Sequence, residues 1–391
     1  MLKLARNCSN HFWMINCSQN SWPPDTKETP NHENDVGLFH GKKNAILYKF
    51  EYLTGNNILS AKSLDNGRNS RVWKLTFVDQ ASPIVGKEYP SNSMDNRKRL
   101  EAEWHGFSFL NSNGFTNIPK PLKCSIKEQI ATYSLLPGSP PTIDCIGINE
   151  IQNISNFIVD LSHLPIKCKE SLKPASDACY TLESFPTLIH QRLSRFYKEG
   201  IYKDLLFTFL EKEFIPTLKK EYKQFCIKKS KYTNQIDQNA KHFDTDIPFT
   251  YLIPSPSDFG FHNTLLNKDG ALNFVDFEFF GWDDPAKLIC DTLIHPGNLI
   301  PEKFKSLFLS QVLSHIPLPE YVLSRIKIVY GITALKWCLI LLNEFIPSNF
   351  NRRIFSKGEE LNQTEVLNHQ MEKARMMLKQ VNDLDGNFPY E

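Results

Sequence analysis

Short apolar runs separated by polar, turn-forming residues dominate the chain between residues 57 and 137. The runs at 72–78, 83–89 and 130–136 have the length of strands. Residues 48–53 alternate crudely between polar and apolar positions, which predicts one more strand. Between these runs, residues 95–113 carry a single apolar stripe at helical spacing. The pattern therefore predicts a β-rich segment that contains one helix.

The apolar pattern changes to helical spacing from residue 148 onward. Residues 148–161, 185–214 and 356–384 each repeat apolar positions three or four residues apart, which predicts helices. The most apolar stretch, residues 326–346, is interrupted by two lysines and a glutamate. We interpret it as a buried helix and expect no integral membrane segment. The second part of the chain is therefore predicted to be mostly helical.

A hairpin pattern interrupts this helical region. Two short apolar runs, residues 264–266 and 271–275, are joined by a polar turn that contains a glycine. Such a pattern predicts a β-hairpin. The hairpin would bring Asn263, before its first strand, close to Asp276, after its second. Asp258, on the preceding loop, would face the same point.

This set of polar residues suits phosphoryl transfer. One carboxylate, Asp258, can orient and deprotonate an attacking hydroxyl. Asn263 and Asp276 can hold Mg²⁺ against the phosphates of ATP, and Glu278 is placed to assist. Asp with Asn five residues later is weak evidence alone, because solvated loops often contain both. The hairpin and the second carboxylate make the functional interpretation the stronger one.

Composition and charge exclude several classes of protein. The chain is 41% hydrophobic and 23% charged with a net charge of +2, which gives no case for nucleic acid as a partner. Its nine cysteines are irregularly spaced without a C-x-x-C pair, so they predict neither a zinc site nor a thioredoxin-like motif, and scattered free thiols fit a reducing compartment. The N-terminus lacks the apolar stretch of a signal peptide, and we expect a cytoplasmic protein.

Residues 255–285 resemble the catalytic segment of the aminoglycoside phosphotransferase (choline-kinase-like) family of small-molecule kinases. W-D-D-P at residues 282–285 is similar to the usual W-x-D-P of that family. The resemblance covers roughly residues 57–291. One departure is Pro256, since the family usually has His two residues before the catalytic Asp. The remaining carboxylates, Asp283, Asp284 and Asp291, resemble residues that brace the catalytic loop.

The resemblance implies an α+β, bilobal protein-kinase-like fold. A poorly ordered extension, residues 1–40, would precede a small antiparallel-sheet N-lobe at residues 41–137. A larger, mostly helical C-lobe at residues 138–391 would carry the catalytic hairpin. We expect the boundary between the lobes at Pro137 and Gly138, where a strand ends in a turn.

The resemblance also assigns ATP-binding residues to the N-lobe. Lys87, on the third strand, resembles the kinase lysine that grips the α and β phosphates. Glu103, on the predicted helix, would pair with it, and Glu101 is the alternative. The preceding hairpin has small polar residues at its tip, and their backbone N–H groups can point at phosphate oxygens. These tip residues are Gly67, Asn69 and Ser70.

The strand at 130–136 resembles the hinge of the family, where main-chain groups meet adenine. Ser134 and Leu136 are the residues at this position. His262, beside Asn263, could be taken for a catalytic base or a metal ligand. Because no second His or Cys lies at ligand spacing, we interpret it as a loop-packing or substrate-facing residue.

The sequence thus predicts an enzyme that transfers the γ-phosphate of ATP, with Mg²⁺, to a hydroxyl of a small molecule. The substrates of the family that the chain resembles favour a sugar or an amino sugar as the acceptor. The alternative is a nucleotide-binding pseudokinase that serves as an interaction or regulatory module. Pro256 and the glycine-poor hairpin favour this alternative, whereas the intact set of Asp258, Asn263 and Asp276 favours the enzyme.

Overall fold

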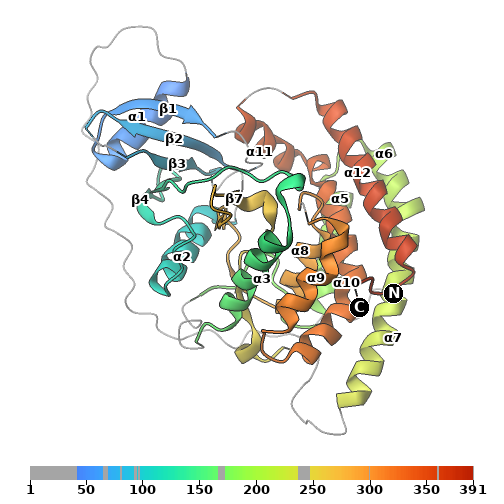
Figure 1. Ribbon diagram of the computed structural model, residues 1–391. Coiled ribbons are helices and arrows are strands. Elements are labelled where there is room, and N and C mark those ends of the chain that lie inside the picture. The colour runs from blue at the N-terminus through green and yellow to red at the C-terminus, as the bar shows by residue number, and fades with distance from the viewer. Residues whose placement is uncertain are drawn as a thin grey trace, which may run out of the picture. The chain divides into compact units, whose positions relative to one another are not determined.

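The computed structural model describes residues 42–64, 69–79, 82–91, 95, 97–165, 172–236, 247–298, 300–358 and 361–390. The extension predicted for residues 1–40 and the predicted phosphate-binding Gly67 lie outside these ranges. The described part of the chain joins a small antiparallel sheet to a larger helical region (Figure 1). This is the predicted α+β architecture.

The sheet has five strands in the order β1-β2-β3-β5-β4, and every neighbouring pair is antiparallel. The strands predicted at residues 72–78, 83–89 and 130–136 are present, shifted by a few residues at their ends. The five strands are β1 (Ile58–Ser63), β2 (Arg71–Phe77), β3 (Ile84–Glu88), β4 (Pro121–Ser125) and β5 (Ile130–Ser134). The central position of β3 matters for function, because this strand carries Lys87.

The strand predicted over residues 48–53 is wrong, because helix α1 (Lys42–Thr54) covers them. Ile46 and Phe50, one helical turn apart, are buried and pack on the apolar face of the sheet. A Cβ at Gly86 of β3 would lie 2.9 Å from the Phe50 ring, so the glycine permits this close approach. The local period of two was too short to exclude a helix.

Helix α2 (Arg99–Ser112) connects β3 to β4 and is the helix predicted at residues 95–113. Its buried face includes Leu100, Phe107 and Leu110, as the apolar stripe predicts. Glu103 lies on the same buried face, although it is charged. A buried carboxylate requires a partner, and the site described below supplies it.

The helical region is built around α10 (Pro319–Leu341), which contacts several other helices and confirms the buried helix predicted there. No helix in the described residues is long and apolar enough to cross a membrane. The helix predicted at residues 356–384 starts only at residue 363. Helix α11 (Pro347–Lys357) ends just before Gly358, which has a left-handed conformation (φ 71°). The helices are α3 (Ile148–Ser162), α5 (Ser184–Glu199), α6 (Lys203–Phe209), α7 (Ile215–Ile236), α8 (Pro285–Ile294), α9 (Glu302–Leu313), α11 (Pro347–Lys357) and α12 (Gln363–Leu384).

The predicted hairpin is confirmed. Strands β7 (Thr264–Leu266) and β8 (Leu272–Phe274) pair antiparallel, with Leu266 opposite Leu272. The N–H of Val275 donates to the carbonyl of Asn263 at 3.0 Å, which closes the open end of the hairpin. A second short ladder pairs β6 (Ile253–Ser255) with β9 (Gly281–Asp283). Together the two ladders fix both ends of the segment that carries Asp258 and Asp276.

Candidate functional site

Asp258 lies on a tight loop between β6 and the hairpin. Its N–H donates to the carbonyl of Pro256 at 2.8 Å, and Ser257 between them has a positive φ of 64°. The amide nitrogen of Asn263 donates to the Asp258 carbonyl at 2.9 Å. The loop thus ties Asn263 to Asp258 directly, and the amide oxygen of Asn263 is left for another partner. This is the proximity that the five-residue spacing predicts.

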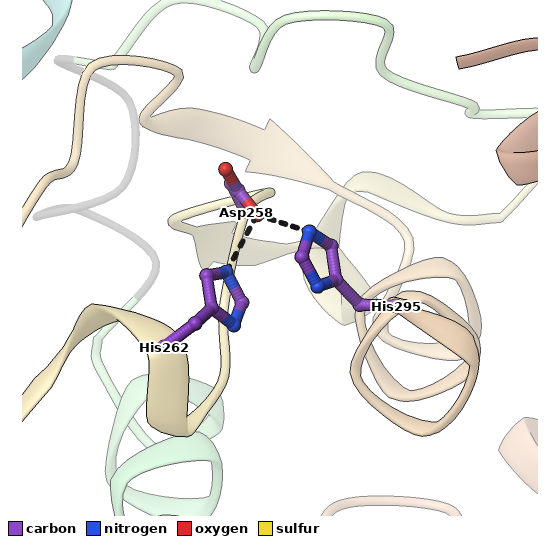
Figure 2. Close-up of side chains that lie close together, drawn as sticks. All are labelled: Asp258, His262 and His295. Carbon is purple, nitrogen blue, oxygen red and sulfur yellow. Dashed lines mark hydrogen bonds and ion pairs between the residues drawn. The ribbon is translucent and has the colours of Figure 1, made fainter. Parts of the chain in front are cut away.

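Two histidines hold the Asp258 carboxylate (Figure 2). The Nε2 atoms of His262 and His295 lie 2.9 and 3.2 Å from the same oxygen, Oδ1. The Nδ1 atom of His295 accepts a hydrogen bond from the N–H of Gly297 at 3.0 Å, so its Nε2 carries the proton that points to Asp258. Burial raises the pKa of Asp258, but the two histidines outweigh it and hold this pKa well below its usual range.

The same three side chains have the ligand types of a transition-metal site, and their ligand atoms lie within 4.8 Å of one another. Two features argue for a positioning role instead. The imidazole rings are parallel within 4° and stacked at 4.0 Å, so the lone pairs in the ring planes do not converge on one point. In addition, the nitrogen of His295 that faces Asp258 is the protonated one. The geometry therefore keeps Asp258 ionised and oriented.

Lys87 is the centre of a second charged cluster. Its side chain is 6% exposed, and its ammonium lies 2.6 Å from both Glu103 and Asp276 and 4.0 Å from Glu278. The predicted pairing of Lys87 with Glu103 is confirmed, whereas Glu101 faces Lys98. Burial lowers the pKa of Lys87, but the three carboxylates outweigh burial and raise it, so the lysine stays charged.

The carboxylate of Glu278 contacts the segment just before β2 and the first residue of α2. Its carboxylate accepts hydrogen bonds from Asn69 at 2.6 Å, Ser70 at 3.0 Å and Arg99 at 2.6 Å. Burial opposes the effect, but Arg99 and then Lys87 lower the pKa of Glu278. The metal-binding role of Glu278 and the phosphate-binding roles of Asn69 and Ser70 stay predictions, because their polar groups already contact one another.

The three residues assigned to the chemistry line one pocket of about 360 Å³. Asp258, Asn263 and Asp276 meet there with Asn69. Asp276, which follows β8, has a positive φ of 68° and a side chain that is 35% exposed toward this space. Much of the remaining lining comes from α5, α10 and α11, which the sequence analysis did not assign to the site.

The predicted hinge residues lie where the sheet meets the catalytic hairpin. Ser134 ends β5, and its hydroxyl accepts from the N–H of Lys120 at 2.8 Å. Three residues beyond Leu136, Ser139 exchanges backbone hydrogen bonds with Leu266 of β7. The segment that includes Ser134 and Leu136 is therefore fixed at both ends, while its role toward adenine and the boundary at Pro137 stay predictions.

The remaining carboxylates of residues 255–291 make buried contacts that stabilise the catalytic segment. Asp284 caps α8 by accepting from the N–H of Ala286 at 2.8 Å, and it pairs with buried Arg325 at 2.5 Å. Asp283 and Asp291 both contact the ammonium of Lys287, at 2.7 and 3.1 Å. These buried contacts agree with the predicted structural roles of the three carboxylates.

His295 is the site residue that the sequence analysis missed. It follows α8, more than thirty residues after Asp258 in the sequence, and only the packing of α8 beside the loop brings the two together. Its ring also packs edge-on against Trp337 of α10 at 4.3 Å. No local spacing signals this contact.

Of the comparisons with known proteins, only the one with solved structures finds similar proteins. No protein-family model matches the sequence, and a search of curated proteins finds no match. Among solved structures, the gentamicin complex of APH(2″)-IIa has a TM-score of 0.58 at 15% identity, covering 90% of this chain and all 100% of that one. Spectinomycin phosphotransferase APH(9)-Ia, bound to ADP and spectinomycin, has 0.55 at 11%, covering 87% and 98%.

A choline kinase from Cryptosporidium parvum has a TM-score of 0.51 at 12% identity, covering 84% of this chain and 91% of that one. At identities this low, the likeness shows the fold alone. The predicted kinase-like fold, and the resemblance to aminoglycoside phosphotransferases and choline kinases at the level of that fold, are confirmed.

Proposed function

We propose that this chain is an ATP- and Mg²⁺-dependent phosphotransferase that moves the γ-phosphate to a hydroxyl of a small molecule of the sugar class. The observation that carries the proposal is the meeting of Asp258, Asn263 and Asp276 in one pocket. These side chains match the base and the two oxygen ligands that phosphoryl transfer requires. They do so within a fold shared with small-molecule phosphotransferases.

The residues present fit Mg²⁺. Asn263 uses its amide nitrogen toward Asp258, which leaves its oxygen as a ligand, and Asp276 offers a partly exposed carboxylate in the same pocket. Carboxylate and amide oxygens are the ligands that Mg²⁺ prefers. When bound, the ion neutralises charge on the β and γ phosphates. Lys87, now 2.6 Å from Asp276, would supply a second positive charge toward the phosphates.

Asp258 would receive the acceptor hydroxyl. The two histidines keep its carboxylate ionised and fix its orientation, so it accepts a hydrogen bond from the hydroxyl and then the proton. A carboxylate with a low pKa is a weak base. Its main contribution is therefore to aim the hydroxyl oxygen at the phosphorus, with proton transfer late in the reaction.

The pseudokinase alternative has one structural observation in its favour. Asn69 and Ser70, which would approach the phosphates, are tied to buried Glu278. If these bonds persist when nucleotide binds, the tip of the hairpin contributes nothing to catalysis. Both functions predict nucleotide binding, so transfer to an acceptor distinguishes them.

The test compares Asp258→Asn with Asp276→Asn for nucleotide affinity and for phosphoryl transfer. Asp258→Asn keeps the size of the side chain but cannot take a proton, so turnover should fall by about 10²–10⁴-fold while Mg-ATP affinity changes little. Asp276→Asn should weaken Mg-ATP binding itself, because it removes charge from the metal site. Transfer by both variants at the wild-type rate would refute the assignment, and a wild type that binds Mg-ATP yet never transfers phosphate would support the pseudokinase.

A further inference from the structure

The wall of the pocket beyond Asp258 is unusually rich in arginine. Arg97 precedes α2, Arg192 comes from α5, and Arg352 and Arg353 come from α11. All four remain partly exposed, with side-chain exposures of 26%, 12%, 10% and 21% in that order. Three separate segments therefore direct guanidinium groups into one space.

The carboxylates of the pocket do not balance these arginines at its surface. Five carboxylates line it: Asp177, Asp258, Asp276, Asp291 and Glu344. Asp258 and Asp276 belong to the proposed chemistry, while Asp291 and Glu344 are 3% and 9% exposed and already paired with Lys336 and Arg353. Among the described lining residues, only Asp177, 32% exposed, is left as an accessible carboxylate on this wall.

The local field at Asp177 is strongly positive. Burial alone would raise its pKa, but Arg192, then Arg97, Lys287 and Lys336 lower the pKa of Asp177 to about 2. Burial, Arg99 and Arg97 lower the pKa of Arg352 to about 10, although Asp95 and Glu278 oppose this effect. Arg97 and Arg192 thus act together on one exposed carboxylate, an arrangement that an added anion would stabilise, whereas Arg352 is held by Asn69 at 2.8 Å and Asp95 at 3.1 Å.

Unused hydrogen-bond donors lie in the same place. The Nε of Arg192 is buried and has no hydrogen-bond partner among the described residues. The Nε of Arg97 lies 4.0 Å from Asp95 Oδ1, at the outer limit of an ion pair. Guanidinium groups bind carboxylates and phosphates through two parallel N–H groups, so both side chains have capacity for an anionic ligand.

We propose that the acceptor of this pocket carries an anionic group, a carboxylate or a phosphate, which Arg97 and Arg192 bind while its hydroxyl faces Asp258. The inference rests on the proposed function, because it names the acceptor class of that same site. It also argues against a purely cationic acceptor, since an amine at this wall would meet four arginines, and Asp177, the accessible carboxylate there, is already held by Arg192. A sugar acid or a sugar phosphate has the required chemistry.

Thermal unfolding of the full chain tests the proposal, with and without saturating Mg-ADP, at constant ionic strength. The probes share one carbon framework and differ in charge: glucose, glucosamine, glucuronate and glucose 6-phosphate, with inorganic phosphate as the smallest anion. The anionic probes should raise the unfolding temperature by mass action, and glucosamine should not. Arg97→Gln and Arg192→Gln should each weaken the binding of these anions by roughly tenfold to a hundredfold.

Arg195→Gln is the matched control, because Arg195 lies on the same helix, is 37% exposed and does not line the pocket. It should bind the anions as the wild type does. The proposal is overturned if no anionic probe stabilises more than glucosamine. It is also overturned if Arg97→Gln and Arg192→Gln weaken Mg-ADP binding in place of anion binding, which would assign the arginines to the nucleotide. Anion binding is measured without nucleotide as well, so it can succeed or fail independently of Mg-ADP. Failure of Mg-ADP to bind would therefore count against the proposed function and not against the anionic acceptor.

Discussion

Replacing Lys87 by methionine separates the structural role of this lysine from its role toward nucleotide. The substitution removes the cation between Glu103 and Asp276, both 2.6 Å away. Asp276 is 35% exposed and Glu278 keeps Arg99, so these two carboxylates stay solvated or paired. Glu103 is 3% exposed and keeps only the hydroxyl of Tyr89 at 2.6 Å among its described side-chain partners. The free-energy cost therefore falls mainly on Glu103.

The magnitude follows from the two ways in which Glu103 can respond. Leaving a buried charge without its partner typically costs about 3–5 kcal/mol. Glu103 can instead take up a proton, and at pH 7 this costs about 1.4 kcal/mol for each pH unit above an unfolded pKa near 4.3, or about 3.7 kcal/mol. In the wild type, however, burial already raises the pKa of Glu103 to about 7 although Lys87 opposes it, so the wild type bears most of this cost as well. We therefore expect Lys87→Met to lose less than about 1 kcal/mol of unfolding free energy through Glu103 at pH 7, and more at higher pH.

The cost should depend on pH in a defined direction. In the variant, the folded state raises the pKa of Glu103 above its unfolded value, so the folded protein binds more protons than the unfolded chain. The wild type does the same up to its own Glu103 pKa of about 7, so stability relative to the wild type falls only as pH rises above about 7, by up to about 1.4 kcal/mol per unit. The deficit should be small at pH 7 and roughly 2–3 kcal/mol at pH 9.

Urea unfolding at pH 7 and pH 9, combined with calorimetric titration of Mg-ADP, measures both roles. The double variant Lys87→Met/Glu103→Gln has no buried carboxylate at this position and should recover most of the stability at pH 9. It should not recover nucleotide binding, because the cation toward the phosphates is still absent. A Lys87→Met protein with wild-type stability at both pH values would refute the buried pair, and wild-type Mg-ADP affinity would refute the assigned grip on phosphates.

Two further predictions concern the metal and the histidines. In the proposed site Asn263 and Asp276 would bind the nucleotide through the ion, so ATP should raise the unfolding temperature far more with Mg²⁺ than with a chelator; equal shifts would count against this metal site. His295→Leu removes a donor to Asp258 and should lower turnover roughly tenfold with unchanged Mg-ATP affinity, whereas His295→Gln, which keeps an N–H donor, should lose less. Equal losses in Leu and Gln would show that His295 serves packing alone.

Local sequence patterns could predict the parts of the site that are close along the chain. The hairpin follows from two apolar runs and a turn, and it places Asn263 beside Asp276 without further information. The pairing of Lys87 with Glu103 was implied by the resemblance to kinases, with Glu101 as the alternative, and the two side chains do meet in the structure. In both cases a short connection limits the possible arrangements.

Contacts between distant segments could not be predicted in this way. Six alternating residues at 48–53 fit a strand, and only the burial of Phe50 against the sheet identifies the helix. His295 and the arginines of α5 and α11 reach the pocket through the packing of whole helices, for which spacing along the chain carries no signal. The partners of Glu278 depend on the same long-range packing.

The fate of the γ-phosphate tests the central claim most directly. Wild-type protein and Asp258→Asn are incubated with Mg²⁺, γ-labelled ATP and the anionic, neutral and cationic sugars in turn, and the label is separated into ATP, inorganic phosphate and organic phosphate. The account predicts that the wild type transfers label to a phosphomonoester of one of these acceptors, and that Asp258→Asn does so about 10²–10⁴-fold more slowly. Label that stays in ATP with every acceptor, or that is released only as inorganic phosphate at equal rates by both proteins, would contradict it.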